Sequence, residues 1–145
     1  MDNSGSFFLL INGTDFVITA PTTYVGDWLT DLDGMMSVSV LLDFRSAAGP
    51  QQLDGDSFLR AYLQTSLDDG NSVIDLACVV FQNGNQQQIF NVAADGTSPA
   101  PMTATDGALA DNTILGGVLG NRLRLKLTTQ GTWVNTYLGG RVVVR

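Results

Sequence analysis

Hydrophobic and polar residues alternate along several short stretches of this chain, with the period of two that is typical of β-strands. In the segment 36–44 the hydrophobic positions on one face are Met36, Val38, Val40, Leu42 and Phe44. The opposite face of that segment carries serine and aspartate among its residues. One face of this strand is therefore expected to lie in a core.

The segment 122–128 alternates just as strictly. Leucines occupy positions 123, 125 and 127, and the residues between them are Arg122, Arg124 and Lys126. A helix would spread those charges around its surface, whereas a strand places them all on one side. The pattern therefore predicts a strand with a basic face.

Turn signals between such stretches predict hairpins. Asp68-Asp69-Gly70-Asn71 separates two extended runs within 60–81, and Asn12-Gly13 separates 7–11 from 15–20. Gly139-Gly140 is expected to be a further turn, between a strand at 132–138 and a closing strand at 141–145.

Eight or nine short strands with glycine-rich turns predict an all-β protein, an antiparallel β-sandwich with a jelly-roll-like arrangement. We expect residues 1–6 to form a flexible N-terminal arm and residues 7–145 a single domain. Ala94 to Thr105, with Pro99 and Pro101, is expected to be a long loop. Asp106 to Gly117 is expected to hold one helical turn.

Composition narrows the function classes. The 145 residues include 14 Asp, seven basic residues, one Cys, and neither His nor Glu, and the net charge is −7. This acidity argues against a nucleic-acid partner. Residues 1–121 carry a charge of −12 and residues 122–145 carry +5. That polarity suits docking between oppositely charged surfaces, or the pairing of basic with acidic strands inside one fold.

The usual side chains for catalysis are missing or isolated. Without histidine a serine nucleophile lacks its common base, and the single lysine, Lys126, is on a strand face expected to be exposed. Aspartates near glycines, at 31–34, 54–56 and 68–71, could hold calcium, although tight turns demand the same residues. We therefore expect no enzyme activity, no cofactor and no metal.

Three other features admit a core or a surface role. Cys78 is expected in the core, since a lone cysteine makes no disulfide within the chain. Trp133 and Tyr137 share a face in a regular strand, and are either core residues or an exposed platform for sugars. No stretch is long and apolar enough to span a membrane, so a protein made in the cytoplasm is expected.

A family resemblance adds to this picture. The segments YLQTSLDDGNSVIDLACVVF, TDGALADNTILGGVLGNRLRLKLTTQGTW and GGRVVVR resemble small β-sandwich proteins of tailed bacteriophages, known as head decoration or cement proteins. The similarity covers Phe58 to Arg145. It implies a virion protein on the capsid surface that binds the major capsid protein and braces capsid subunits, as a homo-oligomer for which we expect a trimer.

The resemblance carries over no functional residues, so the interface candidates come from the sequence pattern. Phe7 and Phe8 point to opposite faces of a strand, which leaves one available to a partner or makes both part of an ordinary edge strand. The other candidates are Pro99, Pro101, Arg122, Arg124 and Lys126. Two alternative functions stay open: a structural protein of the phage neck or tail, and a carbohydrate-binding module.

Overall fold

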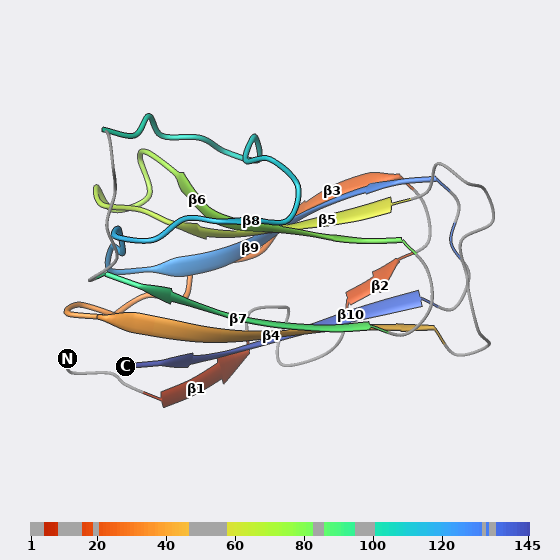
Figure 1. Ribbon diagram of the computed structural model, residues 1–145, viewed down its shortest axis with the longest axis horizontal. Helices are drawn as coiled ribbons and strands as arrows, with labels where there is room; N and C mark the ends of the chain where they lie inside the picture. The colour runs from red at the N-terminus through yellow and green to blue at the C-terminus, as the bar shows by residue number, and fades with distance from the viewer. Residues whose placement is uncertain are drawn as a thin grey trace.

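Ten strands in the described part of the chain form two antiparallel sheets that pack face to face (Figure 1). The computed structural model describes residues 5–8, 16–18, 21–46, 58–82, 86–94, 101–131, 133 and 136–145. The predicted all-β sandwich is confirmed.

Sheet A has the strand order β1-β10-β4-β7. Strand β2 also pairs with β10, on the side where β1 pairs. The bounds are β1 Gly5–Phe8, β2 Phe16–Ile18, β4 Ser37–Ser46, β7 Gln86–Ala93 and β10 Thr136–Val144.

Sheet B has the strand order β3-β9-β5-β6-β8. Its bounds are β3 Thr22–Val25, β5 Phe58–Thr65, β6 Ile74–Phe81, β8 Thr113–Ile114 and β9 Leu123–Gln130.

The pairing of strands is nested along the chain. Strand β1 pairs with β10, β3 with β9, β4 with β7 and β5 with β6, and these pairs belong in turn to sheets A, B, A and B. A long antiparallel ribbon wrapped across two sheets in this way is a jelly roll. The short strand β8 is an addition, in the connection between β7 and β9.

The core lies between the sheets, where the alternating hydrophobic positions meet. Phe44 of β4 stacks on Phe81 of β6 with ring centroids 5.1 Å apart, and the edge of Trp133 meets Phe44 at 5.9 Å. Leu123, Leu125 and Leu127 are fully buried against them. Burial of this apolar surface is the main favourable term for the fold.

The strongest sequence patterns are confirmed. In β4 the side chains of Val38, Val40, Leu42 and Phe44 are buried, and β5 and β6 form the hairpin predicted around residues 68–71. Met36 differs from its prediction, because β4 begins at Ser37 and the Met36 side chain is exposed.

The hairpin predicted around Asn12-Gly13 is wrong. Strands β1 and β2 do not pair with each other, because both pair antiparallel with β10, one after the other in the same direction. The turn residues themselves lie outside the described residues. Gly5 and Ser6, predicted to belong to a flexible arm, are the first two residues of β1, and residues 1–4 are also outside the described part.

The turn predicted at Gly139-Gly140 is also wrong. Strand β10 runs through both glycines, which pair with Asp43 and Leu42 of β4. The helical turn predicted within 106–117 is absent from that segment, which holds the short strand β8 instead.

Candidate functional site

The two outer faces of the sandwich are unlike each other. Residues 101–117, which we call the cover segment, run across the outer face of sheet B above β6 and include the short strand β8 (Figure 1). The backbone amides of Leu115 and Gly117 donate to the carbonyls of Leu76 in β6 and Ala93 in β7. The cover segment is therefore bonded to both sheets.

A buried carboxylate anchors the cover segment. Asp75 of β6 is fully buried and accepts hydrogen bonds from the backbone amides of Gly107, Ala108 and Leu109 at 2.9–3.2 Å. The side-chain amide of Gln64 donates to the same carboxylate at 2.8 Å. Successive backbone N–H groups make a concave anion site, and here the anion is supplied by the chain itself.

A second carboxylate, that of Asp106 in the cover segment, contacts the basic face of β9. Oδ1 of Asp106 accepts from Nε2 of Gln64 at 2.9 Å and from Nζ of Lys126 at 3.1 Å, and the Arg124 guanidinium lies 3.6 Å away. Burial raises the pKa of Asp106, but the hydrogen bonds from Gln64 and Lys126 and the nearby cations outweigh it and leave the pKa lowered. Asp106 is therefore held in its ionised form.

The arginines on this side are also paired. Arg124 lies over the Trp28 ring at 4.4 Å and donates to Gln64, and Arg122 makes an ion pair with Asp69 at 3.0 Å. Arg60 and Asp111 form another ion pair at 2.7 Å. The hydrogen bond from Arg60 lowers the pKa of Asp111.

This network differs from the interface role predicted for Arg122, Arg124 and Lys126. Their side chains are only 14–17% exposed, because the acidic groups of the cover segment and of the 66–73 turn lie against them. These three cations therefore pair with acidic groups of the same chain. Pairing of basic with acidic segments inside one fold was one of the two explanations considered for the uneven charge.

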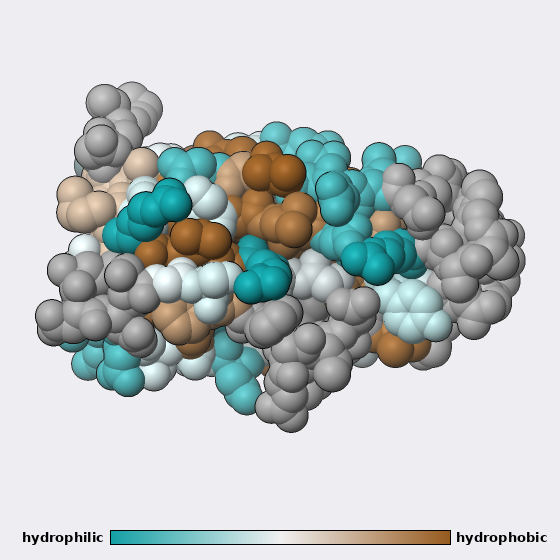
Figure 2. Space-filling view, turned by 90° about the horizontal axis from the view of Figure 1, so that it is seen from below, coloured by the Kyte–Doolittle hydropathy of each residue, from teal (hydrophilic) through white to brown (hydrophobic). Residues whose placement is uncertain are grey.

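The outer face of sheet A has no such cover within the described residues. Figure 2 views the molecule from this side and shows hydrophobic side chains gathered in the middle of the face, between hydrophilic ones. Ile89 is 73% exposed and Val17 53%. Leu41 and Val143 point the same way and are half-buried. We call these four residues the apolar face.

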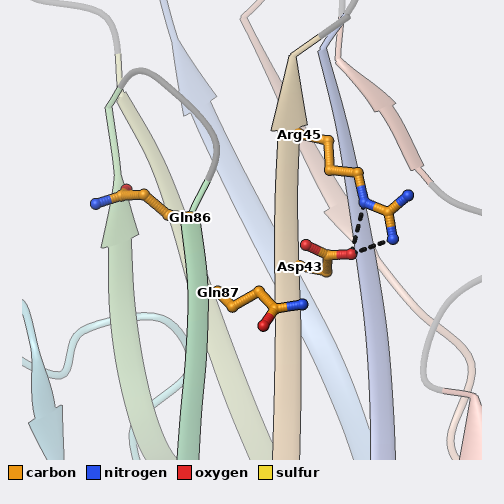
Figure 3. Close-up of a pocket in the computed structure, with 4 residues that line it drawn as sticks. All are labelled: Asp43, Arg45, Gln86 and Gln87. Atoms are coloured by element: carbon orange, nitrogen blue, oxygen red, sulfur yellow. Dashed lines mark hydrogen bonds and ion pairs between the residues drawn. The ribbon is translucent and has the colours of Figure 1, made fainter.

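An open hollow of about 330 Å³ lies at one end of the apolar face. Figure 3 shows its four lining residues, Asp43 and Arg45 from β4 and Gln86 and Gln87 from β7. Nε of Arg45 donates to Oδ2 of Asp43 at 2.6 Å. Tyr137 of β10 lies opposite Arg45 in the sheet. The hollow therefore brings a carboxylate, a guanidinium and the amide of Gln87 close together, whereas the Gln86 side chain points away from them (Figure 3).

The other predicted site residues lie apart. Phe7 of β1 packs against the core, and Phe8 pairs with Arg141 through its backbone. Pro101 is exposed at the start of the cover segment, and Pro99 lies outside the described residues.

Of the two roles considered for Trp133, the core role is confirmed and the exposed platform is wrong, because that side chain is buried. Tyr137 is half-buried on β10. Cys78 is buried as predicted, opposite Tyr62, and burial raises the pKa of its thiol.

The aspartate-glycine loops serve as turns where they are described. Asp31, Gly34, Asp69 and Gly70 have positive φ angles, and the Asp68 carboxylate accepts from the amide of Ser72. Among the described residues, no group of three or more His, Cys, Asp or Glu side chains is placed to hold a metal ion. Asp54 and Asp56 are not described.

Sequence reasoning missed the Asp75 anchor and the apolar face. An aspartate inside the hydrophobic strand IDLACVVF was the available signal for the anchor. The apolar face had none, because the hydrophobic residues of β7 look like core positions in the sequence.

No protein-family model matches this chain, and neither the curated proteins nor the solved structures include a match. The described residues contain no helix of the length and apolar character needed to cross a membrane.

Proposed function

We propose that this protein is a non-enzymatic virion structural protein that binds the outside of a phage capsid and braces neighbouring capsid subunits. The major capsid protein is its partner, and the virion surface is its location. The proposal rests on the resemblance to phage decoration proteins and on the character of one face. Jelly rolls occur in viral capsid proteins and in lectins alike, so the fold alone does not choose between these functions.

The observation that carries the proposal is the contrast between the two outer faces. The face of sheet B is occupied by the cover segment and its ion pairs, with Val25 and Ile114 exposed on its edge strands. The face of sheet A presents Ile89, Val17, Leu41 and Val143, together with the exposed Arg141 opposite Leu41 (Figure 2). Exposed apolar side chains gathered on one face are typical of a protein-binding surface. We infer that sheet A docks on the shell and that the covered side faces outward.

Such docking needs no chemical step. A protein that binds only the assembled shell stabilises the shell in proportion to the logarithm of its free concentration over Kd. A sandwich whose loops are fixed by buried hydrogen bonds loses little freedom when it binds, which favours affinity. The Asp75 anchor supplies that rigidity on the outward side.

Co-sedimentation with phage shells tests the proposal. The wild-type protein is expected to bind in many copies per shell and to raise the temperature at which the shells open. Val17→Asp places a charge on the apolar face and is expected to weaken binding at least tenfold. Val25→Asp is the matched control, since Val25 is an exposed valine of sheet B. Equal binding by the two variants would contradict docking through sheet A.

The number of copies bound per phage particle distinguishes capsid decoration from a structural role in the neck or tail. Decoration of the shell requires many copies, whereas the neck and tail hold few. A few copies per particle would therefore replace the capsid with the neck or tail as the binding site.

A carbohydrate-binding module is the second candidate, and the hollow beside the apolar face favours it (Figure 3). Carboxylate, guanidinium and amide groups bind sugar hydroxyls through directed hydrogen bonds. Binding to a broad glycan panel that Gln87→Ala abolishes, with no binding to shells, would favour this candidate over the capsid.

A further inference from the structure

Strand β7 is an open edge of sheet A. It pairs with β4 on one side, and no strand of the described part pairs with it on the other. Its eight residues, QQQIFNVA, carry no charge, although the chain as a whole has a net charge of −7. Four of its first five side chains are exposed.

Two backbone hydrogen bonds show which backbone groups of β7 face outward. The amide of Ala94 donates to the carbonyl of Met36 at 2.8 Å, just beyond the end of the β4–β7 ladder. Bonded pairs alternate along an antiparallel ladder, so residues 88, 90 and 92 bond to β4 and residues 87, 89 and 91 point outward. The carbonyl of Ala93 accordingly accepts from Gly117 on the outer side, at 2.9 Å.

The devices that normally protect an edge are missing from β7. Edge strands are usually interrupted by lysine, proline or a bulge. Strand β7 contains neither residue, and its pairing with β4 runs through eight residue pairs without a shift. Ile89, in the middle of the open stretch, is more exposed than any other large hydrophobic side chain in the described ranges.

We propose that β7 pairs antiparallel with β7 of a second copy of this chain. With Ile89 opposite its counterpart, Gln87 lies opposite Asn91 and Asn91 opposite Gln87. The three outward residues of each copy then exchange six backbone hydrogen bonds, and the carbonyl of Ala93 keeps its bond to Gly117. The two Ile89 side chains meet at the two-fold axis.

A second copy fits this edge better than a charged partner does. Pairing β7 with itself brings no like charges together, because the strand has none, and the strand equals its partner in length by symmetry. The amide side chains of Gln87 and Asn91 can bond to each other across the junction. The two sheets A become one continuous sheet, and the two apolar faces lie side by side.

Cysteine crosslinking tests the register. Paired residues at the axis have Cα atoms about 5.5 Å apart, which a disulfide can bridge. Ile89→Cys is expected to form a covalent dimer on mild oxidation. Asn91→Cys is the matched control: it lies on the same strand and face, but the Cα atoms of the two copies of residue 91 are separated by about 14 Å. Crosslinking of Asn91→Cys in preference to Ile89→Cys would overturn the register.

Light scattering after gel filtration tests the assembly itself, without shells. The wild-type protein is expected to contain two chains, in place of the trimer expected from the sequence. Ile89→Lys is expected to give single chains, while Ile114→Lys keeps the dimer, since Ile114 is an exposed isoleucine on the short edge strand β8 of the other sheet. A monomeric or trimeric wild type across a concentration series would overturn the proposal, whatever the shells show.

Discussion

The backbone amide of Gly107 lies 3.0 Å from each carboxylate oxygen of the buried Asp75. The amides of Ala108 and Leu109 donate to the same carboxylate. These hydrogen bonds attach the cover segment to strand β6. Burying a carboxylate is costly unless hydrogen bonds satisfy it, and here three backbone groups and Gln64 do so. The anchor and the cover segment therefore depend on each other.

Removing the Asp75 carboxylate should release the cover segment. Asp75→Ala leaves three backbone donors without their acceptor and removes one of the two acceptors of the Gln64 amide. It is expected to lower the free energy of unfolding by about 3 kcal/mol. Urea denaturation measures the loss, and hydrogen exchange should accelerate at residues 107–109. Asp33→Ala, at an exposed aspartate, is expected to change stability by less than about 0.5 kcal/mol. Equal effects would show that Asp75 is no anchor.

Gly120→Ala should be among the most damaging single-methyl changes in this chain. A Cβ atom at Gly120 would lie 1.8 Å from the carbonyl oxygen of Ser66, and that neighbour is backbone. Overpacking against an element that cannot rotate away is expected to cost about 3 kcal/mol or more. Thermal denaturation measures the effect.

Gly107→Ala is the comparison for that variant. Its Cβ would meet the flexible end of Lys126 at 3.2 Å, so space is less restrictive there, but its φ of 86° is one that only glycine adopts readily. A loss of about 1 to 2 kcal/mol is expected. A larger loss for Gly107→Ala than for Gly120→Ala would contradict the assigned clash.

Asp106 should make stability fall in acid. Its pKa in the folded protein is below the ordinary value of 3.8, so its contribution is complete above that value. As the pH falls, the unfolded chain binds the proton first, and the contribution is lost as the pH passes through the lowered pKa of the folded state. Asp106→Asn is expected to flatten the dependence as the pH falls through the ordinary pKa and below it. Parallel curves for the two proteins would disprove this contribution.

The two tryptophans should report opposite environments. Trp133 is buried beside Phe44, and Trp28 is partly exposed beneath Arg124. In Trp28→Phe, the remaining emission from Trp133 is expected at short wavelength and resistant to acrylamide quenching. Trp133→Phe should leave a longer-wavelength, quenchable emission. Strong quenching in Trp28→Phe would place Trp133 at the surface and restore the sugar platform.

Alternation predicted the sandwich because each sheet has one face in the core. Strands β4 and β9 follow it strictly, and their hydrophobic positions are buried as expected. Met36 fits the same alternation but lies outside β4, where its amide donates to the carbonyl of Arg145. Local pattern thus locates a strand more reliably than its ends.

Turn signals failed where tertiary pairing decides the backbone. Gly139 and Gly140 have the composition of a turn, yet β4 alongside them holds β10 extended. The candidate site was more difficult to predict than the strands, because the sequence does not show that residues 106–109 lie against Asp75. The exposure of Ile89 likewise depends on β7 being an edge, which is a property of the sheet order and not of the strand.

The central position of β10 in sheet A has a consequence for synthesis of the chain. Strands β1, β2 and β4 all pair with β10, although each leaves the ribosome long before Val144 does. Sheet A therefore cannot close until β10 has emerged, and β1 stays unpaired until then, because Gly5 pairs with Val144. Folds dominated by such distant pairings form slowly. Until the end of β10 emerges, nascent chains on the same messenger RNA expose hydrophobic strands to each other. A chaperone that binds β4 during this time should therefore raise the yield of soluble protein.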